Sequence, residues 1–220
     1  MKKIITVELG VLALFLFLVH GTFAQEPGDK RVGFGLRGYY YNLEDVRIGD
    51  ELYVPKSTGM LEGNLTFYPH RAFSVEFAAG YTQSDVTYTV SGLSGDFGEF
   101  RQYPILGTAR IHLWNQRAER LSGFYFGAGV GYYINNHTIS DTFENTYPLL
   151  NVQTDNSFGA HANGGFEIYL TDSVSLDLDA KYIFRNEADV TLSSPTLGST
   201  TSEVDRKGWL WGLGIKYYLH

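Results

Sequence analysis

The sequence predicts an all-β fold, an eight-stranded antiparallel up-and-down transmembrane β-barrel, and three observations predict it. Segments of ten or more residues alternate between apolar and polar side chains, as strands with one apolar face do. Eight such segments follow one another along the chain. The connections between them are in turn long and short, which is typical of barrels whose two ends face different compartments.

The clearest alternation lies between Ser157 and Phe184, on both sides of the tight turn Thr171-Asp172-Ser173. One face of this pair carries no charged side chain, and the other is polar almost throughout. Soluble strands average roughly 5–6 residues, whereas a strand that crosses a bilayer at a tilt needs ~9–11. The length and the apolar face therefore favour a membrane-spanning hairpin.

In chain order, the eight expected strands are 31–42, 58–68, 73–82, 100–113, 123–134, 157–170, 174–184 and 207–219. Long loops are expected at 43–56, 83–99, 135–156 and 185–205. The short connections are 69–72, 114–121 and 171–173. Pro104 cannot donate to a β-ladder, so we expect it at a bulge or near a poorly paired strand end.

Both termini of an even-stranded outer-membrane barrel lie in the periplasm, with the short turns. The long loops are then extracellular, and they contain Asp50, Asp85, Asn145 and Ser199. Outward aromatic residues gather near both ends of the expected strands, as the two girdles of such a barrel do. The alternative is a secreted soluble barrel, in which the apolar face would point inward.

The first residues have the three parts of a secretory signal peptide. Lys2 and Lys3 precede an apolar run from Leu9 to Val19, and small residues end the segment at Ala24. We therefore divide the chain into a signal peptide, 1–24, and an outer-membrane β-barrel domain, 25–220. Because Glu8 is atypical of the apolar region, an uncleaved inner-membrane anchor is the alternative. The chain has no cysteine, which excludes a lipoprotein attachment site and disulfides.

Charge gives no sign of a nucleic-acid partner. The formal net charge is −7, and without the first 24 residues the balance is 15 basic to 23 acidic residues, or −8. No basic cluster interrupts this balance, although nucleic-acid binding requires one. The expected partners are the lipid of the outer membrane and, during insertion, the barrel-assembly machinery.

A glycine run and two histidines resemble parts of chemical motifs, but neither feature supports a catalytic or binding function. Gly127-x-Gly129-x-Gly131 lies within an expected strand with no helix after it, unlike a phosphate-binding loop; small inward residues that make room for bulky neighbours explain it better. His112 and His161 face the expected lumen, but no local motif sets a nucleophile beside either of them. We predict no enzyme activity and no catalytic, cofactor or metal site.

The inward-facing charges are more informative. Glu76, Arg110, Glu167, Asp177 and Lys216 fall in a lower layer near the short turns, and Arg37, Glu62, Asp179 and Lys181 fall in the layer above. Charges in so narrow a lumen must be paired. We therefore predict an ion-pair plug with contacts from Lys216 to Asp177 and from Arg37 to Glu62. A conducting cation path is the alternative.

Higher in the lumen, four inward residues at similar height are apolar: Met60, Leu106, Ile183 and Leu210. Apolar side chains are unexpected in a water-filled pore. They predict a small apolar chamber, open toward the loops or sideways into the membrane, that would take a small apolar ligand.

The stretches SFGAHANGGFEIYLTDSVSLDLDAKYI, FYFGAGVGYYI and WLWGLGIKYYL resemble the later strands of OmpW-type eight-stranded outer-membrane proteins. The resemblance covers the C-terminal half, whereas the first strands agree only in pattern. Such barrels usually end on an aromatic residue, but His220 follows Leu219 here. The resemblance implies passage of small apolar molecules across the outer membrane or a role in envelope stress. A non-transporting surface barrel, whose long loops bind a partner or stabilise the envelope, is the alternative function.

Overall fold

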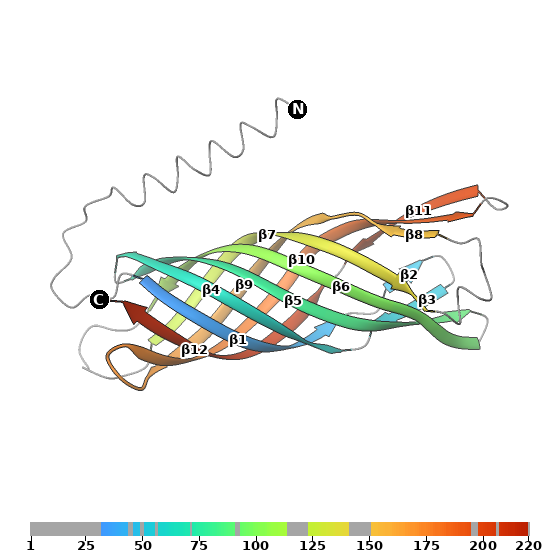
Figure 1. Ribbon diagram of the computed structural model, residues 1–220. Helices are drawn as coiled ribbons and strands as arrows, with labels where there is room; N and C mark the ends of the chain where they lie inside the picture. Colours follow the sequence, from blue (N-terminus) through green and yellow to red (C-terminus); the bar gives the residue numbers. More distant parts are fainter. Residues whose placement is uncertain are drawn as a thin grey trace, which may run out of the picture.

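The computed structural model describes residues 32–43, 46–48, 51–55, 57–70, 72–90, 93–113, 123–140, 151–194, 198–205 and 207–219. The expected signal peptide, Asp50, Asn145 and His220 lie outside these residues. The described strands form an elongated antiparallel barrel (Figure 1). No helix in the described part of the chain is long and apolar enough to cross a membrane.

Eight strands build the wall of the barrel, as predicted. They are β1 (Val32–Leu43), β4 (Thr58–His70), β5 (Phe73–Val90), β6 (Leu93–His112), β7 (Gly123–Ile139), β9 (Ser157–Tyr169), β10 (Val174–Ser194) and β12 (Gly208–Leu219). Each pairs antiparallel with the next, and β12 pairs with β1 to close the wall. Each of these eight strands thereby has a neighbouring strand on both sides, as it must because lipid cannot hydrogen-bond an open edge.

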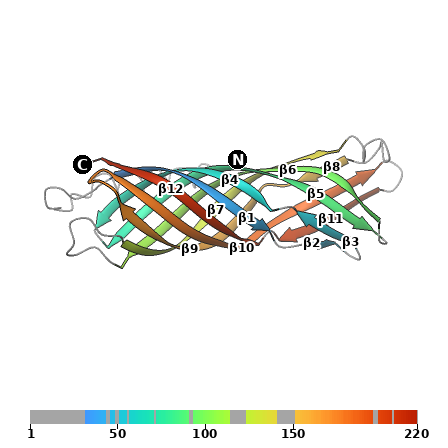
Figure 2. The same cartoon turned by 90° about the horizontal axis from the view of Figure 1, so that it is seen from below.

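The predicted long loops contain further β-structure, which corrects the expectation for these segments. The strands β5, β6, β7 and β10 run beyond their predicted ends, and four short strands pair there: β2 (Val46–Ile48), β3 (Glu51–Pro55), β8 (Asn151–Thr154) and β11 (Gly198–Asp205). All four lie at one end of the barrel (Figures 1 and 2). We call this the hairpin end and the opposite one the short-turn end. Strands with water on both faces need no apolar alternation, so the pattern did not reveal them.

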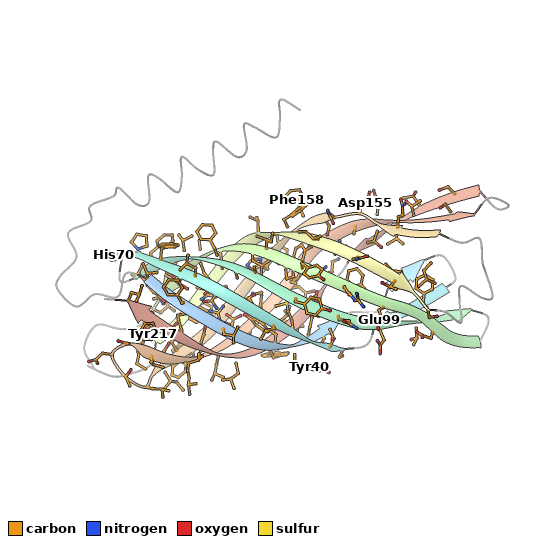
Figure 3. The ribbon with its side chains drawn as sticks, viewed as in Figure 1. Tyr40, His70, Glu99, Asp155, Phe158 and Tyr217 are labelled. Atoms are coloured by element: carbon orange, nitrogen blue, oxygen red, sulfur yellow. The ribbon has the colours of Figure 1, made fainter. Side chains whose placement is uncertain are left out.

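The outer face of the barrel is apolar. Val130 and Phe158 are 68% and 75% exposed, and Phe158 and Tyr40 lie outside the wall in Figure 3. Aromatic rings pack in pairs toward both ends, for example Phe124 with Phe166 at 4.6 Å and Tyr182 with Trp209 at 4.8 Å between ring centroids. An apolar exterior around a polar interior contradicts the soluble-barrel alternative.

Inward glycines make room for large side chains on neighbouring strands. A Cβ at Gly131 would lie 2.5 Å from Leu106 Cδ2 and 3.0 Å from Tyr133 Cε2. A Cβ at Gly212 would collide with the ring of Tyr39. This placement agrees with the structural explanation of the glycines in 127–131.

Pro104 lies inside β6 rather than at a bulge or a strand end. It is paired with Tyr133 of β7. On its other side, the ladder between β5 and β6 has no pairs between Ala79↔Ile105 and Thr82↔Gln102. Because proline has no N–H to donate, this part of the wall is held by fewer hydrogen bonds than its surroundings.

Candidate functional site

The alternation along each strand directs one side chain in two into the lumen, which is the candidate site. The nine charged residues predicted to face inward are all buried, at 0–4% exposure. We call them the ion-pair network; they are Arg37, Glu62, Glu76, Arg110, Glu167, Asp177, Asp179, Lys181 and Lys216.

Arg37 on β1 is the centre of this network. Its Nη1 lies 3.0 Å from Glu62 Oε1, so the predicted contact is present. The same guanidinium donates to Glu76 Oε1 and Oε2 at 2.7 Å and to Asp177 Oδ2 at 2.6 Å. Glu76 and Asp177 belong to the predicted lower layer, so the charges form one connected network rather than two separate layers. The length of the arginine side chain spans both levels.

The remaining cations extend the network around the lumen. Arg110 donates to both carboxylate oxygens of Glu76 and lies 3.8 Å from Asp179. Lys181 Nζ donates to Glu62 Oε2 at 2.7 Å. Glu62 and Glu76 each therefore receive donors from two cations.

Lys216 on β12 reaches two strands away. The predicted contact with Asp177 is present at 3.9 Å, but the shorter contact, 2.7 Å, is with Glu167 Oε1 on β9. Strand adjacency favoured Asp177, because β10 is the direct neighbour of β12. The extended lysine side chain crosses the narrow lumen past its neighbouring strand.

Neutral donors, which are not among the predicted site residues, complete the network. Tyr125 Oη lies 2.8 Å from Asp177 Oδ1 and 2.7 Å from Asp179 Oδ2, and its single proton is shared between the two carboxylates. Tyr218 Oη donates to Glu167 at 2.7 Å. The network has five carboxylates and four cations, so these hydroxyls supply donors that the cations alone do not. Their inward position in the alternation was the signal that could have found them.

The four residues predicted to line the chamber pack together and are shielded from solvent. Met60, Leu106, Ile183 and Leu210 are only 0–4% exposed. They pack with further buried residues, and we call the whole set the apolar cluster: Tyr39, Tyr41, Met60, Ala78, Leu106, Tyr133, Ile183 and Leu210. Instead of the predicted open chamber, side chains fill the lumen at this height in the structure.

A polar layer covers the apolar cluster toward the hairpin end. Gln102 Nε2 donates to Asn135 Oδ1 at 2.9 Å, and Asn135 Nδ2 donates to Ser157 Oγ at 3.2 Å. We call these three residues the amide layer. The inner face of β6 passes from the amide layer at Gln102 through the apolar cluster to the ion-pair network. The apolar cluster thus lies between two hydrogen-bonded polar layers.

The two lumenal histidines have hydroxyl partners. Ser74 Oγ lies 2.7 Å from His112 Nε2, and Thr108 Oγ1 lies 2.9 Å from His161 Nε2. A hydrolase would need an accessible nucleophile and free N–H groups for an oxyanion. Ser74 is fully buried and belongs to the β5–β6 ladder, so this pair does not offer that geometry. Among the described residues, no group of three or more His, Cys, Asp or Glu could hold a metal ion.

A closed eight-stranded barrel with an apolar outer band, aromatic girdles and a polar lumen is an outer-membrane β-barrel. The model of the OmpW family matches residues 56–217, which is more than half of the chain. The chain therefore belongs to the OmpW family.

Solved structures support the fold. The outer membrane protein OprG from Pseudomonas aeruginosa matches with a TM-score of 0.74 at 17% identity, over 88% of this chain and 98% of that one. Outer membrane protein AlkL matches with a TM-score of 0.56 at 15% identity, over 91% and 96%. E. coli outer membrane protein W matches with a TM-score of 0.53 at 13% identity, over 86% and 99%. No curated protein sequence matches the chain.

Proposed function

We propose that the protein lets small apolar molecules cross the outer membrane by way of the apolar cluster. One observation carries the proposal: a cluster containing Met60, Leu106, Ile183 and Leu210 lies inside the lumen between the amide layer and the ion-pair network. Ligand sites for apolar molecules are lined mainly by apolar and aromatic side chains with few polar groups. Apolar side chains would not stabilise water or ions in a water-filled path.

The gap in the ladder beside Pro104 supports a sideways route. Pro104 is an inward residue of β6 and lies between Gln102 of the amide layer and Leu106 of the apolar cluster. A solute that reaches the cluster from the hairpin end would leave through this part of the wall into the lipid, because fewer hydrogen bonds must open there. Membership of the OmpW family also supports passage of apolar molecules.

In this proposal the ion-pair network acts as a plug that keeps ions and water from crossing the lumen. Its side chains are at most 4% exposed. The alternative is a conducting cation path through the same charges. Conductance in planar bilayers separates the two: Lys216→Ala should conduct more than the wild type because a space-filling cation is lost. Wild-type conductance as high as that of Lys216→Ala would exclude the plug.

The test of transport is flux into vesicles. Purified protein should speed the uptake of a small apolar solute above the rate of empty vesicles, and it should not speed the uptake of a charged solute of similar size. Apolar uptake no faster than in empty vesicles would contradict transport.

A second candidate, a surface barrel whose loops bind a partner, has one observation in its favour. The pairing of β5 with β6 continues as far as Val90↔Leu93, and β10 pairs with β8 and β11 at the hairpin end. This ordered β-structure could present a binding surface. The second candidate would be favoured by loop-dependent binding in a protein that gives no apolar flux.

A further inference from the structure

Tyr133 on β7 carries a buried hydroxyl that no group in the described part of the chain satisfies. The residue is 1% exposed, and its Oη has no hydrogen-bond partner among the described residues. It belongs to the apolar cluster. Leaving a buried hydroxyl unpaired is unfavourable, so the site gains when an oxygen or nitrogen atom arrives to pair with it.

Local packing holds the ring of Tyr133 in place. The ring lies over Gly131, where a Cβ would approach Cε2 at 3.0 Å and Cζ at 3.1 Å. Leu106 Cδ2 would lie 2.5 Å from the same Cβ, so both side chains occupy the space that the glycine leaves. The hydroxyl is therefore presented at a fixed place in the apolar cluster.

The surroundings of Tyr133 disfavour a negative charge. Tyr41 and Glu62 interact with it electrostatically. Glu62 already accepts from Lys181 at 2.7 Å and Arg37 at 3.0 Å, so neither cation is left over for an anionic ligand. The whole network carries one more acid than base. A carboxylate placed here would be desolvated without a counter-ion, which is costly.

The cluster also contains a side chain suited to move aside. Met60 is unbranched, and such side chains adapt to irregular spaces. Its Sδ lies 3.6 Å from the position of a Cβ at Gly80, beside Pro104. Displacement of Met60 would therefore open the cluster beside Pro104, and Pro104 is paired with Tyr133 in the ladder.

We infer that Tyr133 is a specificity-determining residue that binds the polar end of the ligand. The preferred ligands are neutral molecules with an apolar body and one hydrogen-bonding oxygen, such as medium-chain alcohols and ketones. Plain hydrocarbons and carboxylates bind less well. This inference rests on the proposed function, since it places the ligand in the same apolar cluster.

The experiment titrates protein in lipid nanodiscs with 1-octanol, n-octane and octanoate, with empty nanodiscs as the baseline. The methyl group of Met60, one of two methionines in the chain, reports binding in the cluster by NMR. Tyr133→Phe removes only Oη. It should weaken octanol binding about three- to tenfold, the value of one ordinary hydrogen bond, and leave octane binding unchanged.

Tyr132→Phe is the matched control, because Tyr132 packs against Phe158 on the outer face. It should bind all three probes as the wild type does. Tyr133→Phe should fold normally, since none of the described residues hydrogen-bonds the group that it removes. Equal octanol binding by wild type and Tyr133→Phe, or tighter binding of octanoate than of octanol, would overturn the inference.

The outcome also separates this inference from transport. If octanol binding depends on Tyr133 but the protein gives no flux, the binding site would be supported and the proposed transport function would be contradicted. If wild type and Tyr133→Phe instead bind octanol equally and give the same flux of apolar solutes, transport would be supported and the role of Tyr133 would be contradicted.

Discussion

Arg37 and Glu62 are direct partners in the register of β1 and β4, and their side chains meet at 3.0 Å inside the lumen. Arg37 also binds Glu76 and Asp177. One arginine thus joins side chains from three other strands of the barrel. Because all of them are buried, removing either partner leaves an uncompensated charge where water cannot reach it.

The first prediction is a double-mutant cycle on Arg37 and Glu62. Arg37→Leu or Glu62→Leu alone should reduce the free energy of unfolding by ~3–5 kcal/mol, and the double variant should lose less than the two combined. Urea unfolding in vesicles measures this. The half-exposed pair Arg101 and Glu99 is the control, for which about 0–1 kcal/mol is expected. Additive losses at Arg37 and Glu62 would count against their coupling.

The second prediction concerns the glycines that face large lumenal side chains. Gly212→Ala places a Cβ against the ring of Tyr39 and should cost ~1–3 kcal/mol of unfolding free energy, as overpacking does. Gly38→Ala is the control, since none of the residues that the structure describes lies within 4 Å of its Cβ position. Equal stability of the two variants would show that the ring and the glycine are not packed together.

The third prediction concerns the lipid-facing surface. Leu178 and Ala128 both face outward. Arginine at either position should cost ~2–4 kcal/mol if it lies near the bilayer midplane, measured by folding into vesicles. Thr138→Arg, nearer the hairpin end of the same strand as Ala128, should cost about 0–1 kcal/mol. No difference between Ala128→Arg and Thr138→Arg would contradict the placement of the apolar band.

The fourth prediction is the orientation of the barrel. Asp85 and Ser199 belong to the hairpin end, and His70 and Asp172 belong to the short-turn end; all four are exposed. In intact cells, a membrane-impermeant thiol reagent should label Asp85→Cys and Ser199→Cys but neither His70→Cys nor Asp172→Cys. The reverse pattern would place the hairpin end in the periplasm.

The wall of the barrel was predictable because every second residue of a membrane-spanning strand faces lipid and must be apolar. That rule located all eight strands and separated Phe158, which faces outward, from His161, which faces inward. Beyond the membrane the rule no longer applies, and strands such as β8 and β11 therefore show no alternation that would predict them. Pro104 shows a second limit: the absence of an N–H predicts weak pairing, but only the fold shows which neighbour loses the pair.

Within the lumen, the sequence pattern predicts which residues face inward. It predicts only some of the contacts between them. Neighbouring strands suggested Arg37 with Glu62, which are in contact. Lys216 shows what strand order cannot give, because its shortest contact crosses to Glu167 on β9. In a narrow lumen, a long flexible side chain can contact a residue on a more distant strand as well as one on the neighbouring strand. The packed state of the apolar cluster likewise depends on tyrosine rings that the hydrophobic pattern did not select.

The most direct test of the proposed route compares two neighbouring alanines on β5 in the vesicle assay. Ala78 faces the apolar cluster, whereas Ala79 faces the lipid. Ala78→Leu adds bulk inside the cluster and should lower the uptake of a small apolar solute toward the rate of empty vesicles. Ala79→Leu should transport as the wild type does. If both folded variants transport at the wild-type rate, the solute does not pass through the apolar cluster.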